Sequence, residues 1–200
     1  MTNVTPPDGR YWSAYNDAQA GRLPRPLCRQ VLAHAGPSDG RLAVDLGCGS
    51  GIETAAMVEA GWRVFATDAD PATPSRVADL VGPEARVEVV VGTFEEVRLP
   101  RADLVYAGYA LPFVAPSHFP DVWSRVREAL RPGGWLAVDL LGDRDSWAGQ
   151  RAMTFLDRES LDGLVQGLEL VSLDEEDEDG RSFSGPKHWH VFHLLARRPR

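Results

Sequence analysis

The chain has 200 residues, of which 44% are hydrophobic and 25% are charged, and this balance is ordinary for a globular protein. A length of this order favours one domain and can bury a sizeable core without structural metals or disulfides. The formal net charge of −8 disfavours a nucleic-acid partner, because affinity for phosphate backbones comes largely from clustered lysine and arginine.

The N-terminal residues lack the basic and apolar regions of a signal peptide, and no run approaches the roughly 20 apolar residues of a membrane span. Two cysteines, Cys28 and Cys48, suggest neither a disulfide framework nor a paired metal motif. We therefore expect a cytoplasmic protein that does not contact membranes.

In chain order, two helices are predicted first, over residues 11–20 and 26–35, with Gly21 and Pro24 between them. From residue 41 onward, short apolar or β-branched runs alternate with helical patterns. The predicted strands are residues 41–46, 62–67, 86–91, 102–107, 135–141, 169–173 and 189–196. The predicted helices among them are residues 52–60, 71–81, 117–130 and 159–167.

This alternation implies parallel βαβ units with helices on both faces of a sheet. The last two strands flank a polar link, residues 174–187, whose lack of a helical pattern predicts an antiparallel pair. We interpret the acidic run 174–179 as the solvated tip of that hairpin. The predicted fold class is therefore α/β: a single-domain, doubly wound, mostly parallel sheet of about seven strands with an antiparallel strand at one edge.

A glycine turn and an acidic residue mark a binding site in this sheet. The first predicted strand leads into Gly47-Cys48-Gly49-Ser50-Gly51, where glycines permit unusual dihedrals and let a ligand approach the backbone. The second predicted strand is followed by Asp68, whose carboxylate can accept both hydroxyls of a ribose. Ligands of open α/β sheets bind at such strand ends, so both features predict a nucleotide-type ligand.

The charge near the turn distinguishes two such ligands. A dinucleotide places its pyrophosphate on the helix N-terminus and prefers the spacing G-x-G-x-x-G, whereas this chain has G-x-G-x-G. Asp45 precedes the first glycine by two positions, and its carboxylate would repel a pyrophosphate. A carboxylate there suits the ammonium and sulfonium groups of S-adenosylmethionine, which the sequence therefore favours.

These blocks resemble the class I S-adenosylmethionine-dependent methyltransferase superfamily. The matching segments are Val44-Asp45-Leu46-Gly47-Cys48-Gly49-Ser50-Gly51, residues 64–70, 91–96 and 102–107, and Leu130-Arg131-Pro132-Gly133-Gly134. The resemblance implies methyl transfer from S-adenosylmethionine, with S-adenosylhomocysteine as product. It makes residues 41–200 the donor-binding domain and residues 1–40 an N-terminal helical lid segment, together one compact domain.

By position in these motifs, the resemblance implies a set of donor-binding residues. They are Asp45, Gly47, Cys48, Gly49, Asp68, Ala69, Thr93, Phe94, Ala107 and Trp12. One of them departs from the pattern, because the superfamily usually has an aspartate at the adenine-facing position where this chain has Thr93. A hydroxyl accepts a hydrogen bond there more weakly, while Phe94 can cover the ring face.

Other segments resemble a narrower branch of the superfamily. Tyr11-Trp12 and Gly21-Arg22-Leu23-Pro24 are similar to the small-molecule branch related to the tellurite-resistance and thiopurine methyltransferases, in which the N-terminal segment folds over the donor. The resemblance implies a small-molecule methyl acceptor. Arg22 is either a partner for the donor's carboxylate or a solvated surface charge.

The catalytic residues stay open, with His118, Tyr109 and Asp143 as candidates. A general base is needed only for an alcohol, phenol or protonated amine, and a thiolate, halide or chalcogen oxyanion needs none. His118 is alternatively a capping or surface residue. Asp143 belongs to Asp143-Arg144-Asp145, which either orients a polar acceptor or forms a loop held by its own ion pair.

The histidine-rich segment 187–193 does not predict a metal site. In a strand, His188 and His190 share one face and His193 lies on the other, and no nearby cysteine completes a zinc set. We therefore expect a packed strand with polar ends and no metal.

Two other functions stay open at this point. One is a nicotinamide-dependent oxidoreductase on a similar sheet, which the glycine spacing and Asp45 disfavour. The other is a non-catalytic module that binds S-adenosylmethionine. The acceptor and the oligomeric state cannot be read from the sequence.

Overall fold

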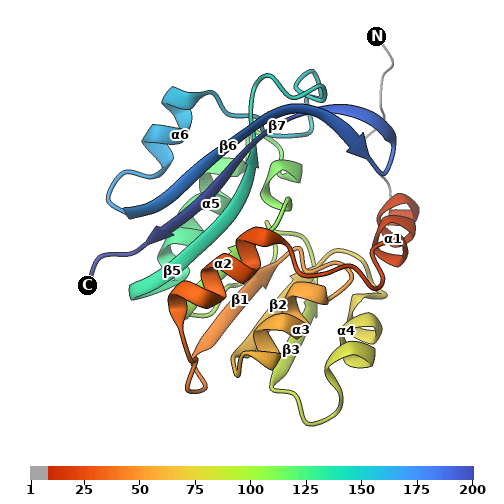
Figure 1. The fold of residues 1–200 in the computed structure, drawn as a ribbon, viewed down its shortest axis with the longest axis vertical. Coiled ribbons are helices and arrows are strands. Elements are labelled where there is room, and N and C mark those ends of the chain that lie inside the picture. Colours follow the sequence, from red (N-terminus) through yellow and green to blue (C-terminus); the bar gives the residue numbers. More distant parts are fainter. Residues whose placement is uncertain (1–8) are drawn as a thin grey trace.

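The computed structural model describes residues 9–200, and within them a seven-stranded sheet runs through the molecule (Figure 1). Its strands are β1 (Leu42–Leu46), β2 (Arg63–Asp68), β3 (Val87–Val91), β4 (Ala102–Ala107), β5 (Leu130–Leu141), β6 (Glu169–Ser182) and β7 (Gly185–Arg197). The spatial order is β3-β2-β1-β4-β5-β7-β6. The first five strands are parallel, and β7 pairs antiparallel with both β5 and β6. This confirms the predicted fold class.

Helices cover both faces of the sheet. They are α1 (Gly9–Ala18), α2 (Pro26–Ala35), α3 (Ile52–Glu59), α4 (Thr73–Val81), the 3-10 helix η1 (Leu111–Phe113), α5 (Phe119–Ala129) and α6 (Arg158–Leu164). Because strand side chains alternate between faces, the core has two layers. On one face Ala43 and Leu104 pack with residues of α2, α3 and α4, and on the other Val44 and Val105 pack with residues of α5 and α6.

The C-terminal hairpin differs from the sequence prediction. Strand β6 continues to Ser182, which pairs with Gly185, so the turn is at Phe183-Ser184 and the acidic run 174–179 lies within a strand. The prediction that this run is the hairpin tip was wrong. The physical reason is that its carboxylates have cationic and histidine partners, described below, that let an acidic segment extend along the edge of the sheet.

Helix α1 lies beneath the tip of the β6–β7 hairpin in Figure 1, and its Asn16 lies against Gly49 of the glycine turn. Asn16 donates to Asp70 over 3.2 Å, and Arg76 bonds to Asp17 and Ser13. At its other side, the Tyr11 hydroxyl lies 2.8 Å from Ser184 Oγ. The first helix of the described residues therefore contacts the tip of the β6–β7 hairpin. Residues 1–8 of the predicted lid segment lie outside the described residues, and the division at residue 40 stays a prediction.

A separate observation concerns membranes. None of the helices in residues 9–200 combines the length and apolar character that crossing a bilayer requires.

Candidate ligand-binding site

A cavity of about 850 Å³ opens at the carboxyl ends of the central parallel strands. Ligand sites for small molecules typically measure about 300–1,000 Å³. Its walls come from the glycine turn after β1, the loops after β2, β3 and β4, helix α1 and the β6–β7 hairpin. The position agrees with the general rule for ligands in open α/β sheets.

The glycine turn forms one wall through close backbone packing. Gly47, Gly49 and Gly51 have φ angles of +68°, +49° and +81°, which side-chain-bearing residues rarely adopt. A Cβ on Gly49 would lie 2.6 Å from Asn16 Oδ1, and one on Gly47 would lie 2.5 Å from the Cβ of Ala110. Gly47 and Gly49 are therefore favoured at these positions, because the loop after β4 approaches Gly47 and the Asn16 side chain of α1 approaches Gly49.

Asp68 is held at the end of β2 by two backbone N–H groups. Its Oδ2 accepts from Gly49 over 2.8 Å and its Oδ1 accepts from Asp70 over 2.8 Å. Burial raises the pKa of Asp68, and the two hydrogen bonds oppose that rise. Each oxygen keeps a free lone pair, so the carboxylate can also accept two ligand hydroxyls.

Asp45 lies at the end of β1 and is 1% exposed. Its Oδ2 accepts from the Thr54 hydroxyl over 2.6 Å. Burial raises the pKa of Asp45 to about 7, because the charged form loses its hydration. A cationic ligand group beside Asp45 would restore the charged form, so this carboxyl is suited to an ammonium group.

Two arginines line the same region with different partners. Arg22 forms a bidentate ion pair with Glu53, at 2.6 and 2.7 Å, so it is neither a free carboxylate-binding group nor a solvated charge. Arg25 donates to the Tyr15 hydroxyl over 2.9 Å and lies 4.6 Å from the Tyr109 ring centroid. Within the described chain, no carboxylate accepts from the Arg25 guanidinium, which leaves it available to an anionic ligand group. Sequence reasoning missed Arg25, which stands between Pro24 and Pro26 at the start of α2.

The loop after β3 supplies Thr93 and Phe94. Thr93 donates from its backbone N–H and its hydroxyl to Glu96 Oε2, at 3.2 and 3.1 Å. Its hydroxyl therefore keeps only acceptor capacity for a ligand. Phe94 lies beside Gly47, since its ring would come within 3.3 Å of a Cβ there.

Most of the predicted donor-binding residues line the cavity. They are Trp12, Asp45, Gly47, Cys48, Gly49, Asp68, Ala69, Thr93 and Phe94. Ala107 does not line it, because alternation along β4 turns its side chain into the core on the face of α5. Its neighbours Tyr106 and Gly108 line the cavity instead.

The candidate catalytic residues are separated by the fold. Tyr109 lines the cavity with φ of +53°, and burial raises its pKa. His118 is exposed outside the lining, with its Nδ1 3.5 Å from Glu95 Oε1. Asp143 is exposed and lies 3.5 Å from the His190 ring, also outside the lining. Tyr109 is thus the member of this set that faces the cavity.

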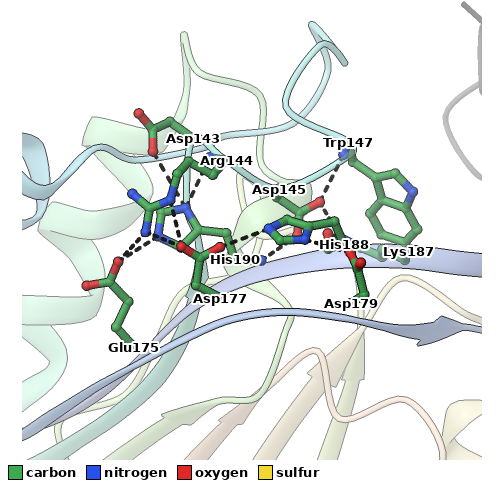
Figure 2. Close-up of polar contacts among 10 residues, drawn as sticks. All are labelled: Asp143, Arg144, Asp145, Trp147, Glu175, Asp177, Asp179, Lys187, His188 and His190. Carbon is green, nitrogen blue, oxygen red and sulfur yellow. Dashed lines mark hydrogen bonds and ion pairs between the residues drawn. The ribbon is translucent and has the colours of Figure 1, made fainter.

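The loop after β5 is tied to the hairpin by ion pairs (Figure 2). Arg144 bonds to Glu175 and Asp177 of β6, at 2.6 and 2.8 Å. Asp145 forms an ion pair with Lys187, and both side chains are fully buried. Of the two alternatives for this loop, an ion pair within the loop is excluded for Arg144 and Asp145, because their partners lie on β6 and β7.

The histidines of β7 contact the carboxylates of β6. His188 lies 2.8 Å from both Asp177 and Asp179, and these carboxylates raise its pKa (Figure 2). His190 lies 2.9 Å from Glu175. Among residues 9–200, no three histidine, cysteine or acidic side chains are arranged to hold a metal ion.

A second polar row lies beside the cavity, and sequence reasoning missed it. His193 Nδ1 lies 2.7 Å from Asp139 Oδ1, and His193 Nε2 lies 3.3 Å from Glu176 Oε2. Although burial opposes it, hydrogen bonding to these two carboxylates raises the pKa of His193. Glu176 lines the cavity, whereas Asp139 is buried.

Comparison with known proteins adds two kinds of finding. Residues 43–134 match the family model described as a methyltransferase domain. Carboxy-S-adenosyl-L-methionine synthase from Yersinia pestis (strain Pestoides F) is 32% identical over 101 residues, or 47% of this chain. The match spans 38% of the length of that relative.

Solved methyltransferase structures are similar over most of the chain. TehB from Haemophilus influenzae has a TM-score of 0.72 at 16% identity, covering 95% of this chain and 66% of that one. NodS, an N-methyltransferase from Bradyrhizobium japonicum WM9 in complex with S-adenosylhomocysteine, has a TM-score of 0.68 at 15% identity. The match covers 94% of this chain and 99% of that one. The 1,6-didemethyltoxoflavin-N1-methyltransferase of Burkholderia thailandensis has a TM-score of 0.66 at 21% identity. The match covers 96% of this chain and 86% of that one. At these identities the likeness shows a shared fold.

Proposed function

We propose that this chain, which carries a methyltransferase domain on the class I methyltransferase fold, transfers a methyl group from S-adenosylmethionine to a small-molecule acceptor. The observation that carries the proposal is the group Asp45, Gly49 and Asp68 around one cavity of about 850 Å³. Asp68 is fixed by the Gly49 backbone, and Asp45 lies buried beside the same turn.

The chemistry of the lining fits each part of the donor. The carboxylate of Asp68 would accept the ribose hydroxyls, and Phe94 with Thr93 would contact adenine. The amino-acid end of the donor is a zwitterion, and the cavity offers one group of each sign: Asp45 for the ammonium and Arg25 for the carboxylate. Arg25 replaces Arg22 in this role, since Arg22 is paired with Glu53.

The donor supplies an activated methyl group on a sulfonium, so the protein's task is to align the acceptor and exclude water. Trp12 of α1 lies edge-on to Phe113, with ring centroids 4.5 Å apart, and both line the cavity. Tyr11 and Tyr15 contact Phe183 of the hairpin turn, with centroids 5.5 and 5.8 Å apart. We assign α1 and this turn as the cover of the site, in agreement with a lid within residues 1–40.

The proposal extends to the partner class and the compartment. The net charge of −8 supports a small-molecule acceptor in preference to a nucleic acid. Cys28 and Cys48 are both free thiols, which supports a reducing compartment such as the cytoplasm.

Titration calorimetry with S-adenosylmethionine and S-adenosylhomocysteine tests the proposal directly. Asp68→Asn should weaken binding of both by roughly tenfold or more, because an amide cannot accept at both oxygen positions. The matched control is Asp79→Asn on the exposed side of α4, which should bind like the original chain. Folded protein that binds neither ligand, or that binds NADH in their place, would overturn the proposal.

A further inference from the structure

The cavity has a second end, built by the β6–β7 hairpin and the loops beside it. The donor-binding group lies after β1, β2 and β3, whereas this end is lined by Tyr109, Trp147, Glu176 and Trp189, which we call the hairpin wall. Tyr109 follows β4, Trp147 follows β5, and the other two lie on β6 and β7. By strand order, β6 and β7 stand at the opposite edge of the sheet from β3.

We propose that the hairpin wall is the methyl-acceptor subsite and that it takes an amine: a nitrogen that is cationic in solution, attached to a flat or apolar body. The inference rests on the proposed methyl transfer and names the acceptor class that the sequence left open.

The aromatic rings provide the first part of the case. The Trp189 ring centroid lies 5.8 Å from that of Tyr109 and 6.1 Å from that of Trp147, so the three rings form one apolar surface. All three side chains are half-buried, and their open sides line the cavity. Aromatic faces attract cations, and they also bury flat apolar groups well.

The two indoles already bind a cation on their buried side. Lys187 Nζ lies 4.3 Å from the Trp147 ring centroid and 4.1 Å from that of Trp189, and it does not line the cavity. Its charge is neutralised by the buried carboxylate of Asp145. The ion pair therefore fixes the two rings from behind without adding net charge to the subsite.

The second part of the case is the carboxylate of Glu176. It lies on the cavity wall and is hydrogen-bonded by His193, which Asp139 holds from the other side. The carboxylates of Asp139 and Glu176 share the one imidazole of His193. With both carboxylates ionised, these three side chains together carry negative charge even when His193 is an imidazolium. An ammonium between Glu176 and the aromatic faces would therefore have both a counter-charge and a cation–π partner.

The other charged side chains at this end of the cavity do not prevent a cation from binding there. Arg25 stacks on the Tyr109 ring and is assigned to the donor's carboxylate. Arg181 lines the cavity from an exposed position on the hairpin, where solvent screens its charge. Glu176 therefore decides the sign of the charge at the hairpin wall.

The chemical step balances with these groups alone. The ammonium gives one proton to the Glu176 carboxylate, which frees the nitrogen lone pair. That lone pair forms the bond to the methyl carbon, and the electrons of the broken carbon–sulfur bond stay on sulfur. The product is a methylated ammonium, and Glu176 returns its proton to water when the product leaves. Glu176 acts as the base, and His193 and Asp139 are positioning residues.

The test uses probes that share one body and differ in the reacting group: 2-phenylethylamine, 2-phenylethanethiol, 2-phenylethanol and 3-phenylpropionate, with tryptamine as a larger amine. Calorimetry measures their binding to the full chain saturated with S-adenosylhomocysteine, and product formation is followed with S-adenosylmethionine. We expect the amines to bind and react in preference. Glu176→Gln should weaken amine binding about tenfold and leave S-adenosylhomocysteine binding unchanged. Glu178→Gln, an exposed position on the same strand face, should change neither.

His193 is tested by the pH dependence of amine binding. The groups facing it are Asp139 from β5, Glu176 and Asp174 from β6, and Tyr109 from the loop after β4. Because the pKa of His193 is raised, the imidazolium persists above its ordinary range, and its deprotonation leaves the hairpin wall more negative. Amine binding should therefore strengthen as pH rises through the pKa of His193, and His193→Gln should remove this step. A purely structural role would lower affinity and leave the step in place.

The outcomes separate two failures. If S-adenosylhomocysteine does not bind, the proposed function fails. If it binds but the thiol, alcohol or carboxylate is preferred, if no amine binds, or if Glu176→Gln leaves amine binding unchanged, only the amine inference is overturned.

Discussion

The two ends of the cavity are built by different means. At the donor end, Asp68 is fixed by backbone N–H groups, and the nearest elements approach through glycines with no side chain. At the hairpin end, the wall is held by side-chain ion pairs, Asp145–Lys187 and Asp139–His193. Backbone hydrogen bonds do not depend on side-chain identity, whereas one substitution removes an ion pair. We therefore expect the proposed acceptor subsite to change more readily by substitution than the proposed donor site.

We expect the largest effect on the free energy of unfolding from a substitution at the hairpin end of the cavity. Lys187→Met leaves the carboxylate of Asp145 buried without its counter-charge, and breaking such pairs typically costs about 3 to 5 kcal/mol. We expect a loss of this size in the free energy of unfolding, measured by denaturant titration. The matched control is Arg131→Met, which removes the partner of Asp103 at a half-exposed site and should cost about 1 kcal/mol or less. Equal losses in the two variants would mean that the buried Asp145–Lys187 pair does not hold the hairpin end more firmly than an exposed pair holds its site.

At the donor end, we expect the addition of a single carbon atom to be enough to reduce stability and affinity. Gly49→Ala adds one carbon, which would lie 2.6 Å from Asn16 Oδ1 at a φ of +49°. We expect a destabilisation of about 1 to 3 kcal/mol and a loss of S-adenosylhomocysteine affinity of roughly tenfold. Both are measurable by thermal denaturation and calorimetry.

The control for this change is another glycine. Gly149→Ala, in the loop after β5, would find nothing within 4 Å and needs no positive φ, so it should leave both quantities unchanged. A tolerated alanine at position 49 would mean that the Asn16 side chain can move away from the turn, and the packing argument would then fail.

The pH dependence of ligand affinity tests the role of Asp45 at the donor end of the cavity. Its carboxyl has a pKa of about 7 in the folded chain, raised by burial, and a bound ammonium should favour the ionised form. Affinity for S-adenosylhomocysteine should therefore rise about tenfold from pH 6 to pH 8, since binding releases the Asp45 proton. Asp45→Asn should bind with a flatter pH profile, and calorimetry in buffers of different ionisation enthalpy counts the released proton.

The same group affects stability without ligand. Because its folded pKa is raised above the unfolded value, Asp45 stabilises the fold most at low pH, and this contribution is lost as pH rises to about 7. Relative to the original chain, Asp45→Asn should therefore gain stability as pH rises from about 4 to about 7. A constant difference across that range would mean that Asp45 is ionised throughout.

The two ends also differ in how much the sequence could predict. Asp45, the glycines and Asp68 follow strand ends within a short stretch of chain, so strand periodicity and motif spacing located them. The partners of the hairpin end are far apart, such as Asp139 with His193, and no local pattern indicates which pairs meet. The acidic run was misplaced for the same reason, since its carboxylates are compensated by Arg144 and His188 from other segments. Ala107 is different: strict alternation from Tyr106 would have turned it away from the cavity.

The smallest predicted effect concerns the exposed side of the hairpin. His188 lies between Asp177 and Asp179, and these carboxylates raise its pKa above the unfolded value of 6.5. Its stabilisation is therefore present below pH 6.5 and is lost as pH rises through the folded pKa. The melting temperature of His188→Gln should be slightly lower than that of the original chain at pH 5.5 and should converge with it by pH 9. Asp179→Asn, which removes one of the two carboxylates, should reduce the difference at low pH. A difference that grows with pH would show that His188 acts as a neutral ring, and the hairpin surface would then not depend on charge.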